Sequence, residues 1–428
     1  MKKKTTIRRD TRIGINFLLV CFIFFPMVDT LTGLFRSMQI NFPIGIMYRM
    51  LLILAMVVIN LLNGIKLNKL FFNSCITFLI LLVIILCQTL YFQRDFGLTF
   101  QEFTSLLKFY LWIIILNFVV QMSHKITRKD IENIFIYSNL IFTVCYILPK
   151  ILGLGETSYE DSSAGYKAFF IGINDATYVL IILASFLVVY ILCNNELSNI
   201  HRIFLIILFF IDIFIFIIMG TKTALLSGVL LFIFFTIQFF YNRSTINIYM
   251  KLIYFICLLI SFVFILFFGK DMLGMAWAGS FNRLKYFYEL YTGNILRFIT
   301  SSRSTYLGLA FKQLFTFKVI GLFLGVIGFG YDYRWVLFNR RGGLIEMDFF
   351  DIYFSYGLIG FLLWTIFIVY LMCILCKQKK MDIYAWLFLI SLFYSFFAGH
   401  VFFSALSTSV FGFICSAIVL STEKGKGK

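Results

Sequence analysis

The chain alternates between long apolar runs and short polar connections. A helix that crosses the hydrocarbon core of a bilayer needs about 20 apolar residues, and the runs come close to this length. They lack the strict alternation over about ten residues that marks the strands of a membrane β-barrel. The pattern therefore predicts an all-α polytopic membrane protein of about twelve transmembrane helices. The predicted spans are residues 13–33, 42–62, 70–91, 105–122, 131–153, 169–193, 203–219, 222–241, 250–269, 350–375, 383–399 and 401–420.

Two connections are short enough to predict tight turns. Gly220 and Thr221 separate the seventh span from the eighth, and Gly399 and His400 separate the last two spans. Glycine favours such turns because it adopts positive φ without a steric penalty. Each of these two pairs of spans is therefore expected to form a helical hairpin.

Composition and charge exclude other classes of protein. Of the 428 residues, 61% are hydrophobic and 13% are charged, whereas a soluble domain averages about 25% charged residues. The net charge of +17 is carried largely by short loops and tails that fall on one side of the predicted spans. By the positive-inside rule this places both termini in the cytoplasm. The charge is thus explained by topology and contact with anionic lipids, and we expect no nucleic acid partner.

One segment breaks the pattern. Residues 270–349 follow nine predicted spans, and alternation places them outside the cytoplasm. The segment is basic, and aromatic and leucine residues recur through Ser304–Phe329, which favours amphipathic helices that lie on the membrane surface or cap the bundle. We expect three parts: a bundle over 1–269, an extracytoplasmic segment over 270–349, and three spans with a basic cytoplasmic tail over 350–428.

Two cations on the outer side are candidates for binding an anion. Lys222 lies in the turn after Gly220, where it can hold a phosphate or reach the membrane interface as a snorkelling side chain. Arg303 lies at the start of a predicted helix that Ser301 or Ser302 can cap. A helix N-terminus favours anions, and a guanidinium adds bidentate hydrogen bonds. The alternative for Arg303 is an ordinary surface arginine.

Three carboxylates at the entry to the tenth span are candidates for a catalytic base: Glu346, Asp348 and Asp351. Asp348, Asp351 and Ser355 have the spacing of one helix face. Carboxylates in such a place can act as proton acceptors. Acidic residues are also favoured at a helix N-terminus by its dipole, and this alternative explains Asp351, the deepest of the three, least well.

Three further residues are candidates to line the same cavity: His400, Asp175 and Asp212. The alternative for His400, a lone histidine near the outer surface, is a hydrogen-bonded interface residue, and the alternative for Asp175 is a helix cap. Asp212 lies within the seventh span, and an ionisable group at membrane depth is usually functional. The sequence has no phosphate-binding glycine loop and no His, Cys or Asp cluster with metal-ligand spacing, so we expect neither a cofactor nor a metal.

The order of several motifs carries a resemblance. Gly-Thr-Lys-Thr-Ala-Leu-Leu at 220–226 is followed by an arginine before a helix, by the glycines of 321–330, and by a polar cluster ahead of Gly-Leu-Ile-Gly at 357–360. This order, over residues 170–420, resembles the O-antigen ligase/polymerase superfamily of bacterial enzymes. Lys222 and Arg303 stand at the positions of the family's two arginines. Glu346 stands where its ligases carry a histidine followed by asparagine.

The resemblance implies a glycosyltransferase type C-like fold and a metal-independent, inverting glycosyltransferase. It implies a polysaccharide polymerase that transfers polyprenyl-pyrophosphate-linked glycan onto a hydroxyl of another lipid-linked repeat unit, with a flippase and a chain-length regulator as partners. The absent histidine argues against the ligase branch, and Glu346 or Asp348 would then be the base. Two alternatives stay open: a ligase that moves glycan to another acceptor, and a flippase or transporter for lipid-linked sugars.

Overall fold

The computed structural model describes most of the chain, and nearly all of that part is helical. The described residues are 2–40, 42–158, 165–241, 249, 251–256, 258–260, 263, 289, 294, 297, 300–325, 344–378 and 381–423. The side chains of residues 2–11, 318, 422 and 423 lie outside this description.

The chain forms two compact units. Unit 1 consists of Met1–Gly14, Ile53–Ile131 and Tyr291–Lys428, and unit 2 consists of Ile15–Leu52 and Glu132–Leu290. The division predicted at residues 269 and 349 concerns the side of the membrane on which each part lies, and it stays a prediction.

Within the described residues, eight helices are long and apolar enough to cross a bilayer. Each falls on a predicted span, so the protein is a multi-pass helical membrane protein, as expected. The eight are α3 (Ile44–Asn63), α4 (Lys69–Tyr91), α5 (Phe96–Gln121), α6 (Arg128–Ile151), α7 (Ile173–Cys193), α8 (Asn199–Met219), α9 (Lys222–Tyr241) and α15 (Asp348–Cys376).

The last two predicted spans correspond to shorter helices. They are α16 (Ile383–Phe397) and α17 (Ala405–Glu423). The turn predicted at Gly399 and His400 is present, but the chain then stays non-helical until Ala405, four residues later than expected. Most of the predicted span 250–269 falls outside the described residues, so the total of about twelve spans stays a prediction.

The first predicted span, residues 13–33, is divided between two helices. α1 (Lys2–Ile23) and α2 (Phe25–Ser37) meet at a bend of 51°. Pro26 lies in the first turn of α2. Proline has no backbone N–H, and its ring clashes with the carbonyl four residues earlier in a continuous helix. The apolar run is therefore interrupted where its one proline falls.

Unit 2 is organised around α7, which is buried along nearly its whole length. α8 and α9 pack against α7 and against each other. Their hairpin is closed by Gly220, whose φ of 66° lies in the left-handed region that favours glycine. The predicted turn at Gly220 and Thr221 is confirmed.

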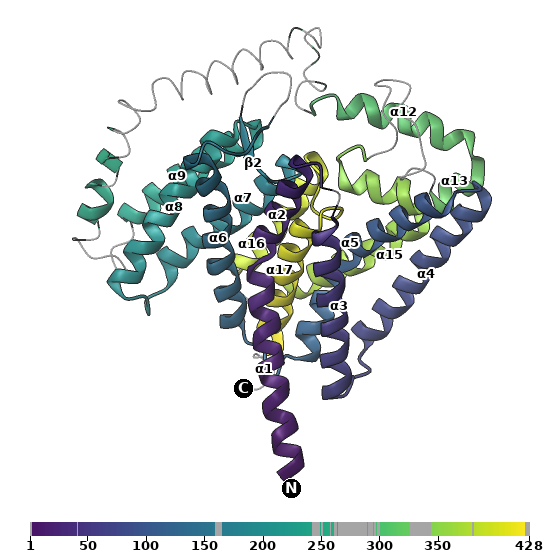
Figure 1. The fold of residues 1–428 in the computed structure, drawn as a ribbon, viewed down its shortest axis with the longest axis horizontal. Coiled ribbons are helices and arrows are strands. Elements are labelled where there is room, and N and C mark those ends of the chain that lie inside the picture. The colour runs from purple at the N-terminus through teal and green to yellow at the C-terminus, as the bar shows by residue number, and fades with distance from the viewer. Residues whose placement is uncertain are drawn as a thin grey trace. The chain divides into compact units, whose positions relative to one another are not determined.

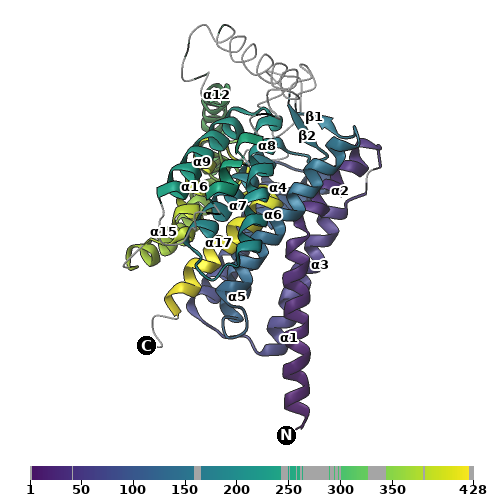
Figure 2. The same cartoon turned by 90° about the vertical axis from the view of Figure 1, so that its left-hand side faces the viewer.

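A short antiparallel pair of strands precedes α7, an exception to the predicted all-α class. β1 (Glu156–Thr157) pairs with β2 (Tyr166–Ala168), and the two lie side by side in Figure 2. Phe170 follows β2 and stacks on Phe142 and Tyr146 of α6. The sixth predicted span therefore began too early: its apolar pattern includes residues that pack beside the helix rather than within it.

Unit 1 has α5 at its centre, with α17 packed along it. The two helices approach closely because Gly412 of α17 faces the backbone of α5. A Cβ atom added to Gly412 would lie 3.0 Å from Cα of Trp112. Side chains of α15 and α16 also contact this pair, since Trp112 packs against Phe367 and Phe388 packs against Phe411.

The helices predicted within 304–329 are present as α12 (Arg303–Thr316) and α13 (Lys318–Leu324), and Figure 1 shows α13 beside α15 and α4. α13 ends against a break in α15, where Gly357 has a φ of 66° and a ψ of −169°. The side-chain amide of Gln88 donates to the carbonyls of Leu324 at 2.6 Å and Ser355 at 2.8 Å. Irregular backbone at membrane depth is tolerated when its polar groups are satisfied in this way.

Substitution of Gly357 with alanine should destabilise unit 1. The new Cβ would overlap the carbonyl of Phe323, and a left-handed φ alone costs a residue with a Cβ about 1–2 kcal/mol. Gly308→Ala in α12 is the matched control, because a Cβ there meets nothing within 4 Å. Thermal unfolding of the purified protein in detergent should show a lower midpoint for the first variant only. Equal midpoints would contradict the close packing at this break.

Candidate active site

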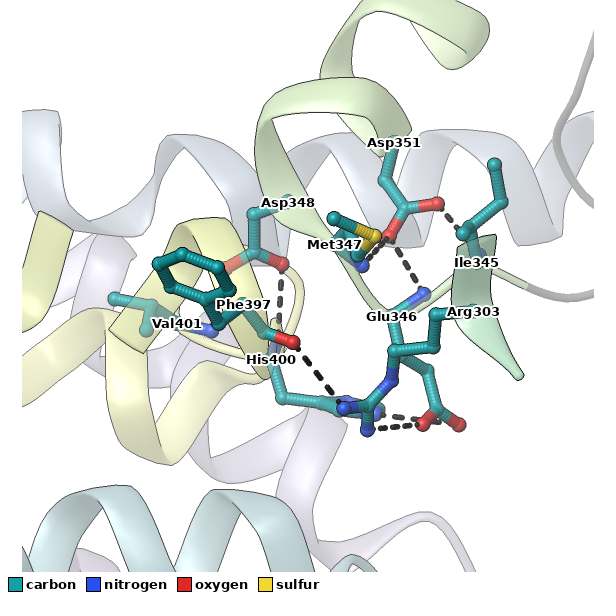
Figure 3. Close-up of polar contacts among 9 residues, drawn as sticks. All are labelled: Arg303, Ile345, Glu346, Met347, Asp348, Asp351, Phe397, His400 and Val401. Carbon is teal, nitrogen blue, oxygen red and sulfur yellow. Dashed lines mark hydrogen bonds and ion pairs between the residues drawn. The ribbon is translucent and has the colours of Figure 1, made fainter. Parts of the chain in front are cut away.

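Three ionisable side chains from separate parts of unit 1 meet in one cluster (Figure 3). Arg303 begins α12, Glu346 lies two residues before α15, and His400 lies between α16 and α17. Nη2 of Arg303 donates to Oε2 of Glu346 at 2.8 Å, and Nε2 of His400 lies 3.6 Å from Oε1. Nη1 of Arg303 also donates to the carbonyl of Phe397 at 3.3 Å. The carboxylate therefore lies between a guanidinium and an imidazole.

The three side chains are enclosed but not sealed. The exposed fraction is 13% for Arg303, 32% for Glu346 and 24% for His400. A polar molecule can therefore reach the Glu346 and His400 side chains, while their partial burial strengthens the electrostatic interactions among them.

Asp348 fixes the loop that carries His400. Its carboxylate is fully buried and accepts the backbone N–H of His400 at 2.9 Å, of Val401 at 2.8 Å and of Phe402 at 3.2 Å. Hydrogen bonds between a carboxylate and backbone N–H groups are among the stronger ones in proteins. Asp348 thereby determines where His400 lies.

Asp351 does the same for the segment that carries Glu346. It is also buried, and it accepts the N–H of Ile345 at 2.6 Å, of Glu346 at 2.9 Å and of Met347 at 3.0 Å. Asp348, Asp351 and Ser355 are all buried, but so are Ile352 and Tyr356 on other faces of α15, so the shared polar face stays a prediction. The oxygens of both aspartates are thus occupied by backbone N–H groups, and the Glu346 side chain is the more accessible of the three candidate bases.

The backbone around the cluster is strained. Among the described residues, seven that are not glycine have positive φ. Four of them lie here: Ser301, Ser302, Glu346 and His400, with φ of 50°, 69°, 69° and 65°. Such conformations persist only where the surroundings enforce them, and they concentrate at functional sites. This concentration of positive φ makes the cluster the candidate functional site of unit 1.

The start of α12 differs in detail from the expectation. Ser302 occupies the N-cap position but its side chain makes no capping hydrogen bond. Oγ1 of Thr300 instead accepts the N–H of Ser304 at 3.3 Å. The positive φ of Ser302 turns the chain so that Arg303 can reach Glu346.

The charge of Glu346 is set by its two neighbours. Burial by itself raises the pKa of a carboxyl group, but the hydrogen-bonding and charge interactions with His400, together with the charge and hydrogen bond of Arg303, more than offset this effect. The pKa of Glu346 therefore lies below its usual range. The side chain is an anion throughout the physiological pH range, and its contribution to stability is lost only when the pH falls through that lowered pKa.

The remaining candidate residues belong to unit 2. Asp212 is buried in α8 and accepts hydrogen bonds from Nδ2 of Asn139 at 2.8 Å and from Oγ1 of Thr143 at 3.1 Å. Lys222 is the first residue of α9, and Asp175 lies in the first turn of α7. Their proximity to Arg303 and Glu346 stays a prediction.

A buried cluster of polar side chains near the break of α15 was not predicted from the sequence. Arg94 and Glu102 are both nearly fully buried, with Nη1 and Oε1 3.5 Å apart, and Arg94 also donates to Gln88 at 3.3 Å. Glu102 lies in α5, ahead of the predicted start of that span, so the apolar pattern gave no sign of its burial. Gln88 lies inside an apolar run, and a polar residue in that position could have marked it as structural.

An ion pair between two helices also occurs in unit 2. Arg49 of α3 pairs with Asp29 of α2, and its guanidinium lies 5.5 Å from the ring centre of Phe25. Across the part of the chain that the structure describes, no group of three or more His, Cys, Asp or Glu side chains is arranged to hold a metal ion.

Replacing Asp348 or Asp351 with asparagine should destabilise the site. An amide offers one acceptor oxygen and turns its NH₂ group toward backbone donors, so at least one N–H loses its partner. Each lost hydrogen bond to a charged group costs about 1.5–3 kcal/mol. Denaturant or thermal unfolding in detergent should register this loss for both variants.

Asp95→Asn is the matched control for these two variants. Asp95 caps α5 by accepting the N–H of Leu98 at 2.7 Å at an exposed position, and asparagine caps a helix equally well. Unfolding midpoints of the Asp348 and Asp351 variants that match this control would show that the two carboxylates are not required to hold the loops.

Comparison with known families adds an independent observation. The family model described as O-antigen ligase like membrane protein matches residues 13–272. This match starts earlier than the expected resemblance over 170–420, includes Lys222, and ends before Arg303. No curated protein matches the chain. Because the match covers more than half of the sequence, the chain belongs to the O-antigen ligase-like family of membrane proteins.

Proposed function

We propose that the protein is a polysaccharide polymerase. It transfers glycan from a polyprenyl diphosphate carrier to a hydroxyl group of another lipid-linked repeat unit on the outer face of the membrane. Membership of the family supports a membrane enzyme that acts on lipid-linked glycans. The observation that carries the proposal is the contact of Arg303, an anion-binding side chain, with Glu346 beside His400, two groups able to handle a proton.

The reaction needs charge stabilisation at the leaving group. When the bond between the sugar and the diphosphate breaks, the electron pair stays on the phosphate oxygen and negative charge accumulates there. Arg303 can bind this oxygen through its guanidinium. Lys222 of unit 2 serves as the second cation in this proposal. The donor already carries the energy of the bond, so the transfer requires neither ATP nor a metal.

The acceptor hydroxyl must lose a proton as its oxygen attacks the sugar. Attack from the face opposite the diphosphate inverts the configuration at the sugar carbon. Among the three carboxylates predicted as candidate bases, Glu346 is the one placed to take part, because its side chain is the most accessible. Asp348 and Asp351 act as positioning residues, since their oxygens hold the loops that present His400 and Glu346.

The proposed topology places this chemistry outside the cytoplasm. With both termini cytoplasmic, the segment 270–349 and the start of α15 lie on the outer side, where lipid-linked units arrive. A flippase would supply these units and a chain-length regulator would limit their number. Anionic lipids would contact the basic cytoplasmic loops.

A ligase is the second candidate, favoured by the description of the matching family. The two activities share the donor and the diphosphate leaving group and differ in the acceptor. A polymerase adds glycan to another lipid-linked unit, whereas a ligase adds it to a different molecule. Analysis of the product formed by the purified protein separates them.

Loss of the Arg303 guanidinium should abolish chain growth. Removing a single charge-stabilising group of this kind costs about 10²–10³-fold in rate, so Arg303→Ala in a strain lacking the native gene should leave single repeat units on the cell surface. Gel analysis of surface glycan measures this result. Lys312→Ala, an exposed cation on the same helix, is the matched control and should retain long chains.

Other results of this experiment would count against the proposal. Absence of any exported glycan in the Arg303 variant would indicate a flippase. Normal chain lengths would show that Arg303 does not serve the reaction.

Lys222 should require only its positive charge. Lys222→Arg should retain polymer synthesis. Lys222→Ala should reduce it about 10-fold or more, because the diphosphate leaving group then keeps only one of its two stabilising cations, Arg303. The rate of polymer formation from lipid-linked units, measured with the purified protein, tests this expectation. Full activity of the alanine variant would remove Lys222 from the site.

A further inference from the structure

We propose that His400 is the group that receives the proton of the acceptor hydroxyl, and that Glu346 is a positioning residue that holds the imidazole and stabilises its protonated form. This inference rests on the proposed function. In it, Glu346 is no longer a candidate for the base.

The contacts of Glu346 leave it poorly suited to accept a proton. One oxygen accepts the hydrogen bond of Arg303 and the other faces His400. These neighbours lower the pKa of Glu346 below its usual range. A carboxylate with a lowered pKa holds a proton weakly, whereas a base works best when its pKa is close to the working pH. Histidine meets this condition with its ordinary chemistry.

The backbone around His400 fixes the position of its imidazole. Its φ is 65°, a conformation that favours glycine, and the adjacent Gly399 has the same φ. A Cβ atom added to Gly399 would overlap the backbone of Glu346, so the two loops touch directly. The N–H of His400 is held by Asp348. A side chain kept in a strained conformation and directed at a carboxylate indicates a functional requirement for it.

The anion that faces the imidazole favours its protonated form during the reaction. Glu346 supplies this charge from the segment before α15. Asp348 and Asp351 of α15 lie behind it, with their oxygens turned to backbone N–H groups. Arg303, from α12, opposes this charge, but it is paired with Glu346. When the diphosphate donor binds Arg303, the phosphate charge partly neutralises the guanidinium, which further favours an imidazolium ion.

The step conserves atoms and charge. The oxygen of the acceptor hydroxyl forms a bond with the sugar carbon, and the bond from that carbon to the diphosphate oxygen breaks. The proton of the hydroxyl passes to the imidazole of His400, and the electron pair of the broken bond remains on the diphosphate at Arg303. The imidazolium then releases its proton to water.

The decisive variant is His400→Gly, because the backbone at this position already has the φ that glycine prefers. The assay uses the purified full-length protein and lipid-linked repeat units extracted from cells that lack it. We expect the rate to fall at least about 100-fold, with an unchanged unfolding midpoint. Added imidazole should restore the rate at least several-fold for this variant, and it should not stimulate Arg303→Ala.

Two further variants keep the result unambiguous. His400→Gln retains a polar side chain but cannot take up the proton, so it should be as slow as His400→Gly. His201→Gln, an exposed histidine near the start of α8, is the matched control and should be fully active. Activity of either His400 variant within about twofold of the unmodified protein, or a folded His400→Gly protein that imidazole does not restore, would overturn the assignment.

The pH profile distinguishes the base from its partner. Removing a nearby anion disfavours an imidazolium ion, so Glu346→Gln should shift the acidic limb of the rate profile to lower pH while keeping its shape. If the limb disappears in Glu346→Gln and persists in His400→Gln, Glu346 is the base and the inference fails. Each rate is scored on donor consumption as well as on polymer formed. Transfer to an acceptor other than a lipid-linked unit would therefore refute the polymerase while leaving the test of His400 intact.

Discussion

Two buried carboxylates, each satisfied by backbone N–H groups, are the interaction on which the candidate site depends. Asp348 and Asp351 lie at the start of a membrane-spanning helix and are almost inaccessible to solvent. An ionised carboxylate in such a place is costly unless it is hydrogen-bonded. Each accepts three consecutive backbone N–H groups from a non-helical segment. The contacts that relieve the cost of burial also fix the segments that present Glu346 and His400, so the stability of these segments and the geometry of the candidate site have the same origin.

The same constraint governs the other irregular places of the fold. A membrane offers no water to an exposed carbonyl or N–H group, so a break in a helix needs a partner nearby. Gln88 fills this role where α13 meets the break of α15 at Gly357. The same need applies to a buried side chain within a regular helix: Asn139 and Thr143 donate to the carboxylate of Asp212 in α8. These polar residues are structural necessities of a helical bundle whose helices do not all run straight through it.

The cluster of Arg303, Glu346 and His400 departs from local conformational preference. Positive φ at residues other than glycine weakens the fold, and natural sequences accept this cost mainly where function requires a fixed geometry. Here the strain brings a guanidinium and an imidazole to opposite sides of one carboxylate. Groups held in place before substrate arrives need little reorganisation during the reaction, which is a principal source of catalytic power.

The sequence by itself determined the class of the protein and the eight long membrane-spanning helices of the described residues, and it named Arg303, Glu346 and His400 as candidates, because apolar length, charge and turn residues are local properties of the chain. The break between α1 and α2 could also have been predicted, because Pro26 lies inside an apolar run. Only the tertiary structure decided that Asp348 and Asp351 hold backbone loops and that His400 lies beside Glu346. The contact between Asp348 and the loop of His400 joins segments that are distant along the chain. No local sequence pattern specifies which backbone N–H groups a buried carboxylate will accept.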